Sequence, residues 1–307
     1  MRPRYRWQLK TRTLELGVRT SVMGIVNVTP DSFSDGGKFF DRDKAVEHAL
    51  AMLDEGATIL DVGGESTRPG AGVRDSGLPA DEELRRVIPV IEGIRRAAPD
   101  AIISVDTYKA EVAREAVRAG AEIVNDVSSM RWDSGMAATL EQLHCGVVLM
   151  HMRGRPDEWH TLPLMDDVVR VVHSELADAA LAATDARIGR NQIVLDPGFG
   201  FGKLYEDNYP LLAQLDQLHG LGYPLLVGTS RKSFIGKTLA RTGTPVPPSE
   251  RLYGTVATVT AAILKGAHIV RVHDVKPAVD AAAIADEILR ATPEDSSERR
   301  SIGDLLA

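Results

Sequence analysis

Short apolar runs rich in β-branched residues alternate along this chain with longer segments in which apolar positions recur every three or four residues. Short buried strands followed by amphipathic helices are typical of repeated βα units around a parallel sheet. We count eight such units. The predicted strands are Val22–Val26, Ile59–Val62, Ile102–Val105, Ile123–Asp126, Val147–His151, Ile193–Leu195, Pro224–Val227 and Ile269–Val272.

The helical segments complete this pattern, and glycines such as Gly56 and Gly120 end helices just before strands. The predicted helices are Asp43–Glu55, Ala80–Ala97, Lys109–Ala119, Leu164–Ala186, Tyr209–Gln217, Ser249–Lys265 and Pro277–Arg290. Periodicity alone allows either a closed barrel or an open doubly wound sheet. Because the length suits a barrel and no glycine-rich dinucleotide fingerprint follows the first strand, we predict a single-domain (β/α)8 TIM barrel of the α/β class.

The predicted barrel occupies residues 21–291, with an N-terminal extension at 1–20 and a polar C-terminal tail at 292–307. A net charge of −7 argues against nucleic acid or an anionic membrane as partner, so we expect small-molecule substrates. The basic residues near the N-terminus precede no apolar run, which indicates a cytoplasmic protein. The only cysteine, Cys145, lies in an apolar run and is expected to be a buried structural thiol.

Polar residues gather where the predicted strands end, and a barrel places its active site at those ends. They are Asn27, Asp61, Asp106, Asn125, Asp126, His151, Asp196, Arg271 and His273. Any one of them is explained equally well as a helix cap or a loop acceptor. Three cations, Arg68, Lys232 and Arg271, together with Asp106 and Asp196, would be costly to desolvate unless a charged, hydrogen-bonding ligand completed them.

Three loops extend this picture. Gly228–Ser233 leads into a helix after the seventh strand, where such barrels often hold phosphate on backbone amides. The glycine-rich runs 35–37 and 196–203 are equally well interpreted as mobile lids or as ordinary turns. Phe33 and Phe201, one in each region, either cover an aromatic ligand or anchor the loops.

Three long motifs make the family recognisable. Val22–Gly37 reads VMGIVNVTPDSFSDGG, Asp61–Gly70 reads DVGGESTRPG, and Leu226–Gly236 reads LVGTSRKSFIG. The chain closely resembles the dihydropteroate synthases from about Val22 to the last helix. The resemblance implies condensation of 6-hydroxymethyl-7,8-dihydropterin diphosphate with p-aminobenzoate, with release of diphosphate and assistance from Mg²⁺.

The resemblance also implies roles for individual residues. Lys232, Arg271, His273 and Asp106 are the implied catalytic residues. The implied pterin contacts are Asp106, Asn125, Asp196, Lys232, Met150 and Phe201. The implied diphosphate contacts are Asn27, Arg68, Arg271 and His273, and Asn27 is also the implied ligand of the Mg²⁺ ion. The expected p-aminobenzoate contacts are Thr67, Pro69, Ser230 and Phe33.

Three other functions are compatible with the sequence pattern, and the chain also carries a signal for its oligomeric state. A methyltransferase-type pterin-binding barrel, a non-catalytic pterin-binding paralogue and a generic phosphosugar barrel are the rival interpretations. The family is dimeric, and Ser249–Lys265 is apolar on more than one face, so we expect a homodimer. Because sulfonamides mimic p-aminobenzoate, we expect inhibition by them. For His151 we prefer a structural role.

Overall fold

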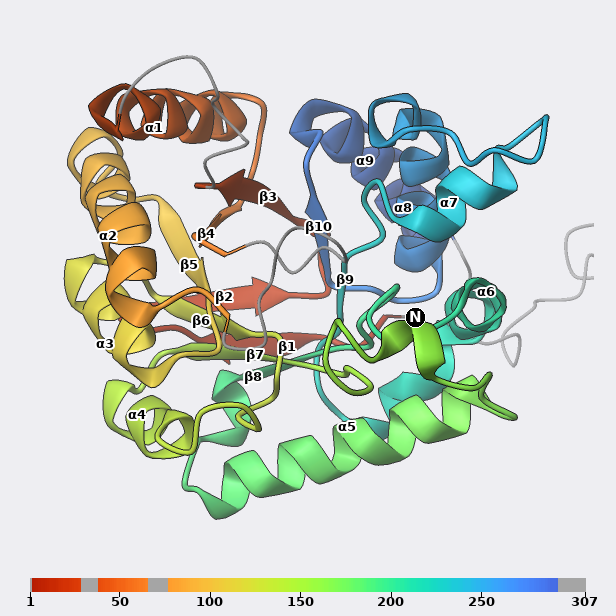
Figure 1. Cartoon of the computed structure of the whole chain (residues 1–307), viewed down its shortest axis with the longest axis horizontal. Coiled ribbons are helices and arrows are strands. Elements are labelled where there is room, and N and C mark those ends of the chain that lie inside the picture. The colour runs from red at the N-terminus through yellow and green to blue at the C-terminus, as the bar shows by residue number, and fades with distance from the viewer. Residues whose placement is uncertain (1, 29–37, 66–76, 292–307) are drawn as a thin grey trace, which may run out of the picture.

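The computed structural model describes residues 2–28, 38–65 and 77–291 (Figure 1). Eight parallel strands form one sheet in the order β8-β7-β6-β5-β4-β3-β10-β9. A parallel bridge from Leu195 in β8 to Leu225, just before β9, joins the two edges. The strands are β3 (Ser21–Asn27), β4 (Ile59–Gly63), β5 (Ile102–Asp106), β6 (Ile123–Asp126), β7 (Gly146–Met150), β8 (Ile193–Asp196), β9 (Leu226–Val227) and β10 (Ile269–Val272).

The helices surround this sheet in chain order, from α1 at the top left of Figure 1, past α5 at the bottom, to α9 at the top. They are α1 (Lys38–Asp54), α2 (Ala80–Ala97), α3 (Ala110–Ala119), α4 (Met136–Leu143), α5 (Val168–Asp185), α6 (Tyr205–Ala213), α7 (Ser233–Thr238), α8 (Leu252–Leu264) and α9 (Val275–Ala291). The predicted (β/α)8 TIM barrel is confirmed. Of the described helices, none has an apolar stretch long enough to cross a bilayer.

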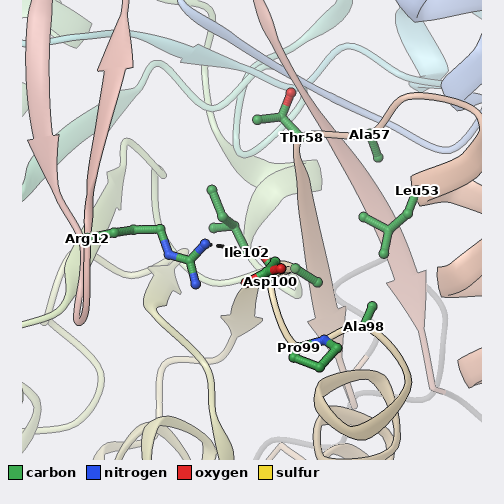
Figure 2. Close-up of a pocket in the computed structure, with 9 residues that line it drawn as sticks. Arg12, Leu53, Ala57, Thr58, Ala98, Pro99, Asp100 and Ile102 are labelled. Atoms are coloured by element: carbon green, nitrogen blue, oxygen red, sulfur yellow. Dashed lines mark hydrogen bonds between the residues drawn. The ribbon is translucent and has the colours of Figure 1, made fainter.

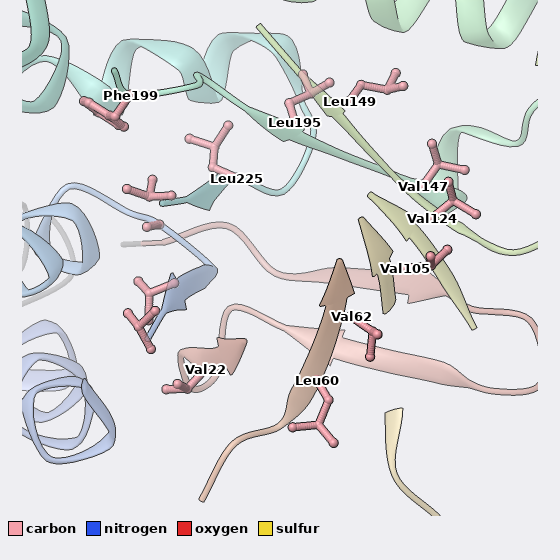
Figure 3. Close-up of a cluster of buried hydrophobic side chains, with 14 of the residues drawn as sticks. Val22, Leu60, Val62, Val105, Val124, Val147, Leu149, Leu195, Phe199 and Leu225 are labelled. Atoms are coloured by element: carbon pink, nitrogen blue, oxygen red, sulfur yellow. The ribbon is translucent and has the colours of Figure 1, made fainter. Parts of the chain in front are cut away.

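The largest apolar core lies between the strands and the helices. Side chains that point outward from the strands, such as Leu60, Val105 and Leu195, pack there against the helices (Figure 3). Because successive strand residues face opposite sides, a strand buried on both faces has a continuous apolar run in its sequence. This is why the strands could be predicted closely from short β-branched runs.

The second core fills the amino end of the barrel. Inward-facing residues from all eight strands meet there, among them Met23, Ile59 and Val148. An N-terminal hairpin of β1 (Tyr5–Gln8) and β2 (Thr13–Leu16) covers them and buries Trp7 completely against them. The Trp7 Nε1 donates to the carbonyl oxygen of Gln192 at 2.7 Å. The hairpin therefore closes the floor of the barrel.

Several predicted boundaries were wrong, for local reasons. The helix predicted at Tyr209–Gln217 is α6, which begins four residues earlier because Asp207 Oδ2 accepts the backbone N–H of Leu204 at 2.8 Å. The helix predicted from Leu164 is α5, which begins at Val168 after Asp167 caps it. Strands β1 and β2 and helix α4 were not predicted from the sequence.

Candidate active site

The interior of the barrel changes from apolar to polar along the strands. Every second strand residue faces the barrel axis, so inward side chains form layers. The floor contains Ile59 of β4 and Ile102 of β5, and two residues further along the same strands the inward positions hold Asp61 and Ser104. We call this second layer the acid layer. It comprises Ile25, Asp61, Ser104, Asn125, Met150, Asp196 and Arg271.

A buried ion network joins four strands in this region. The Arg271 Nε donates to Asp61 Oδ2 at 2.6 Å, and its Nη2 donates to Asp106 Oδ2 at 2.6 Å. The Asn125 Nδ2 donates to the same Asp61 oxygen at 3.0 Å. Because the side chain of Asp61 is fully buried, these two donors replace the water that the carboxylate loses on folding. The network fixes the guanidinium of Arg271 within the acid layer.

Burial shifts the protonation of two acids in the site. Desolvation raises the pKa of Asp106 to about 7, although the positive charge of Arg271 opposes the shift. Desolvation likewise raises the pKa of Asp196 to about 6, against the hydrogen bond that its carboxylate accepts from Gly198 N at 2.7 Å. Such strong shifts cluster at functional sites. The carboxylates are therefore poised to change charge near neutral pH.

Two buried polar atoms of the second layer have no hydrogen-bond partner among the described residues. They are Asp61 Oδ1 and Ser104 Oγ, which belong to residues paired across β4 and β5. Leaving such an atom unpaired costs on the order of 1–3 kcal/mol. A flat ligand with N–H donors along one edge would pair these atoms, which favours a nitrogen heterocycle as the ligand of this layer.

The loops after β8 and β9 meet at the mouth. The Lys232 Nζ lies 3.7 Å from the centroid of the Phe201 ring, and this ring contacts Trp159 edge-on at 5.5 Å between centroids. The Ser230 Oγ lies 2.9 Å from His273 Nδ1 and accepts from the backbone N–H of His273 at 3.2 Å. Cationic, aromatic and hydroxyl groups thus surround the entrance to the acid layer.

Arg231 gives the loop after β9 its shape. This residue has a left-handed backbone with φ of 56°. Its guanidinium donates twice to Asp274, from Nε at 3.0 Å and from Nη2 at 2.6 Å, and its backbone N–H donates to Thr255 of α8 at 3.0 Å. The anchored turn lies between the two site residues Ser230 and Lys232.

Most of the predicted site residues that the structure describes line this mouth or the layer below it. Those that lie together are Asp106, Asn125, Asp196, Lys232, Met150, Phe201, Ser230, Arg271 and His273. Asn27 ends β3 beside Gly63 at the same end of the barrel. Phe33, Thr67, Arg68 and Pro69 lie outside the described residues.

Two residues of the polar layer were not assigned to the site from the sequence. Asp61 was noted only as a strand end, and Ser104 was not noted. The signal that could have found them is their place two residues after the inward apolar positions Ile59 and Ile102. Cys145 is buried as expected, and burial raises the pKa of its thiol to about 12.

A separate cavity of about 440 Å³ lies at the opposite, amino end of the strands (Figure 2). It is bordered by the turn of the hairpin at Arg12 and by the segments that precede β4 and β5. Its one cation is already engaged, because Arg12 pairs with Glu122 at 3.0 Å and donates to the carbonyl oxygen of Asp100 at 3.0 Å. The residues that line this cavity therefore offer no unpaired cation to a ligand.

Comparison with known proteins identifies the family of this chain. Residues 23–273 match the family model described as pterin binding enzyme. The chain is 47% identical over 280 residues to the dihydropteroate synthase of Bacillus subtilis (strain 168), covering 91% of this chain and 92% of that protein. It superimposes with a TM-score of 0.83 and 45% identity on Xanthomonas albilineans dihydropteroate synthase with 4-aminobenzoic acid, covering 95% and 100% of the two chains.

A second solved structure, Yersinia pestis dihydropteroate synthase in complex with a sulfonamide drug, gives a TM-score of 0.82 and 44% identity, covering 91% of this chain and 97% of that one. Fold and site thus define a pterin-binding barrel enzyme. More narrowly, the chain belongs to the dihydropteroate synthase family. It is a transferase that forms 7,8-dihydropteroate in folate biosynthesis, as the motifs implied.

Proposed function

We propose that the acid layer binds the pterin ring of 6-hydroxymethyl-7,8-dihydropterin diphosphate. Asp106, Asn125 and Asp196 offer oxygen acceptors to the amino and ring N–H groups, and Lys232 donates to ring acceptor atoms. Met150 and Phe201 provide apolar contact with the ring. The observation that carries this assignment is the buried, unpartnered Asp61 Oδ1 beside two acids, Asp106 and Asp196, whose pKa burial raises to about 7 and about 6. Such a pocket suits a polar but uncharged ring.

The diphosphate end is assigned to the mouth. Arg271 and His273 point to one side of β10, with His273 nearer the mouth, and Arg68 joins them in this proposal. Asn27 would supply an amide oxygen to Mg²⁺. The described residues contain no cluster of three or more His, Cys, Asp or Glu, which fits an ion held mainly by phosphate oxygens and water. When bound, Mg²⁺ would neutralise charge on the departing diphosphate.

The second substrate, p-aminobenzoate, is assigned to the outer mouth. Its carboxylate would meet the hydroxyl of Ser230 and neighbouring amides, while Thr67, Pro69 and Phe33 would shape the pocket. We also propose that sulfonamides inhibit the enzyme by occupying this place, as their likeness to p-aminobenzoate suggests. Turnover that is unchanged at about millimolar sulfonamide would argue against the assignment.

The reaction needs no protein nucleophile in this proposal. The C–O bond to diphosphate breaks first, and the electron-rich dihydropterin stabilises the methylene cation that remains. The neutral aniline nitrogen then attacks this carbon and releases its proton to solvent. Arg271 and His273 stabilise the negative charge that develops on the leaving group, while Lys232 and Asp106 hold the ring in place, so charge stabilisation is the main catalytic term.

Diphosphate release and dihydropteroate formation by the purified protein, with both substrates and Mg²⁺, test the proposal. We expect turnover in the wild type and its loss in Lys232→Ala. Lys237→Ala is the matched control, because Lys237 is an exposed lysine of α7 that lies over Tyr205. Pterin binding without turnover would favour a non-catalytic paralogue or a methyltransferase-type barrel. Failure to bind either substrate would overturn the site.

We also propose that the protein is a homodimer that works in the cytoplasm. α8 and α9 pack against each other, and their outer faces expose Tyr253, Leu264, Ile284 and Ile288. Large apolar side chains grouped on neighbouring helices are typical of an interface between subunits. For the cytoplasm, the support is a chain with a single cysteine and therefore no internal disulfide.

A further inference from the structure

A buried lysine lies beside the proposed site without a part in the reaction. Lys203 ends the glycine-rich loop that follows β8, and it is only 6% exposed. Its Nζ lies 2.7 Å from His151 Nδ1 and donates to the carbonyl oxygen of Gly198 at 2.8 Å. Longer contacts at 3.4 Å reach the carbonyl oxygens of Phe201 and His151. Burying an ammonium group is costly, and the acceptors around Lys203 Nζ offset part of that cost.

Lys203 connects the loop to the surface of the molecule. The Nε2 of His151, on the other side of the imidazole ring, lies 3.2 Å from Glu175 Oε2 of α5. Burial lowers the pKa of His151 to about 4, so the ring is neutral, accepts from Lys203 at Nδ1 and carries its proton at Nε2, which approaches Glu175 without an aligned hydrogen bond. The Glu175 side chain is 42% exposed. A chain of polar contacts therefore runs from solvent to the loop.

The loop itself needs an anchor. Gly198, Gly200 and Gly202 all have positive φ, and glycine-rich backbone loses much conformational entropy when it is ordered. A Cβ at Gly198 would lie 2.0 Å from the carbonyl oxygen of His151, so the loop packs directly on the end of β7. The bonds from Lys203 reach Gly198 near the start of this loop and Phe201 near its end, and the Phe201 ring contacts Lys232.

We propose that Lys203 is a positioning residue, whose ammonium group fixes the loop 197–202 against the end of β7 and thereby seats Phe201 and Lys232 over the pterin. His151 and Glu175 hold the ammonium group in place from the side of α5. The inference rests on the proposed pterin site and adds a residue that touches neither substrate.

Protonation of Lys203 controls the anchor. An ammonium group has three donors for the surrounding acceptors, whereas the neutral amine has two. Desolvation, the largest cause, and the nearby charge of Lys232 together lower the pKa of Lys203 to about 7, against the opposing charges of Asp196, Glu175 and Asp207. The anchor therefore weakens as pH rises through this value, and the KM for the pterin substrate rises with it.

The first test uses Glu175→Gln, which changes one partly exposed side chain outside the substrate site. Loss of this negative charge lowers the pKa of Lys203 further, so the alkaline limb of kcat/KM for the pterin substrate moves to lower pH, while kcat on the acid side stays as in the wild type. Asp178→Asn, on the exposed face of the same helix, is the matched control and leaves the profile unchanged. Identical profiles for the two variants overturn the proposal.

The second test measures the loop directly. In Lys203→Met we expect faster amide hydrogen exchange in the peptide 197–204 and a KM for the pterin substrate that is higher by about tenfold, the loss of one charge-assisted hydrogen bond, with a smaller change in kcat. Unchanged exchange in that peptide also overturns the proposal. If the wild type itself makes no dihydropteroate, the proposed function fails instead, and the exchange result still decides whether Lys203 anchors the loop.

Discussion

Asp61 is the residue on which the charge balance of the barrel interior depends. Its Oδ2 accepts from both Arg271 and Asn125. In Asp61→Ala the Arg271 guanidinium, whose side chain is 20% exposed, keeps only Asp106, so we expect the free energy of unfolding to fall by about 3 kcal/mol, the lower end for a broken buried pair. Urea denaturation measures this, with the exposed Asp100→Ala as control. A loss within about 0.5 kcal/mol of the control would contradict the role.

The acid layer also predicts how pterin binding depends on pH. Burial raises the pKa of Asp106 to about 7 and that of Asp196 to about 6. Ionised carboxylates are the better acceptors for ring N–H groups, so in Lys203→Met, where the opposing titration of Lys203 is absent, we expect affinity for a pterin to fall as pH decreases from about 8 to about 5. Titration calorimetry with 6-hydroxymethylpterin measures it. A constant affinity over this range would argue that neither acid receives a pterin proton donor.

The same shift has the opposite sign for the stability of the ligand-free fold. The pKa of Asp196 is about 6 in the folded protein, against 3.8 for the ordinary group. Its protonated form therefore stabilises the fold fully below pH 3.8, and this contribution is lost as pH rises through about 6. We expect the wild type to lose stability relative to Asp196→Asn as pH rises from about 4 to about 7. A constant difference between the two would be inconsistent with a buried, raised pKa.

At the scale of the element, the turn after β9 depends on one left-handed residue. Arg231 has φ of 56° and is held by Asp274. Arg231→Gly and Arg231→Ala both lose this ion pair, but only alanine pays for the left-handed backbone, so the glycine variant should be about 1 kcal/mol more stable. Thermal unfolding of the two variants side by side measures the difference. Equal stability would mean that the turn relaxes to another conformation.

Elements were predictable where their local signal was strong. The strand Ile123–Asp126 and the helix Ala80–Ala97 were predicted with the bounds that the structure has, because both are long or apolar enough to show their periodicity. The hairpin Tyr5–Leu16 was missed because its two strands are only four residues long and each contains a charged residue. In addition, Trp7 and Leu9 are buried only by contact with the floor of the barrel, which is distant in sequence.

The site was predictable to a similar degree. Strand-end acids such as Asp106 and Asp196 stood out because barrel chemistry collects at those ends. The pairing of Arg271 with Asp61 was not predictable, since it depends on residues 210 positions apart that meet only when the sheet closes. The anchoring role of Lys203 likewise depends on a contact with His151, which sequence order does not reveal.

For the whole molecule, the main open prediction is its assembly. Tyr253 is 86% exposed on α8 and Ile284 is 65% exposed on α9. We expect light scattering at about micromolar concentration to give a dimer for the wild type and a monomer for Tyr253→Glu combined with Ile284→Asp, because buried carboxylates without partners would oppose the interface. Leu181→Asp, an exposed leucine of α5, is the control and should remain dimeric. A monomeric wild type would remove the prediction.

The hairpin at the amino end leaves the barrel interior open at its other end only. Trp7 and the apolar layer above it close the floor, so substrates and products enter and leave the described interior through the mouth. Under the proposed assignments the pterin ring lies one layer deeper than the p-aminobenzoate contact Ser230. The pterin substrate must then bind first, and a molecule of p-aminobenzoate that binds before it would block its path to the deeper layer. Initial rates should therefore follow an ordered sequence, with the pterin substrate leading.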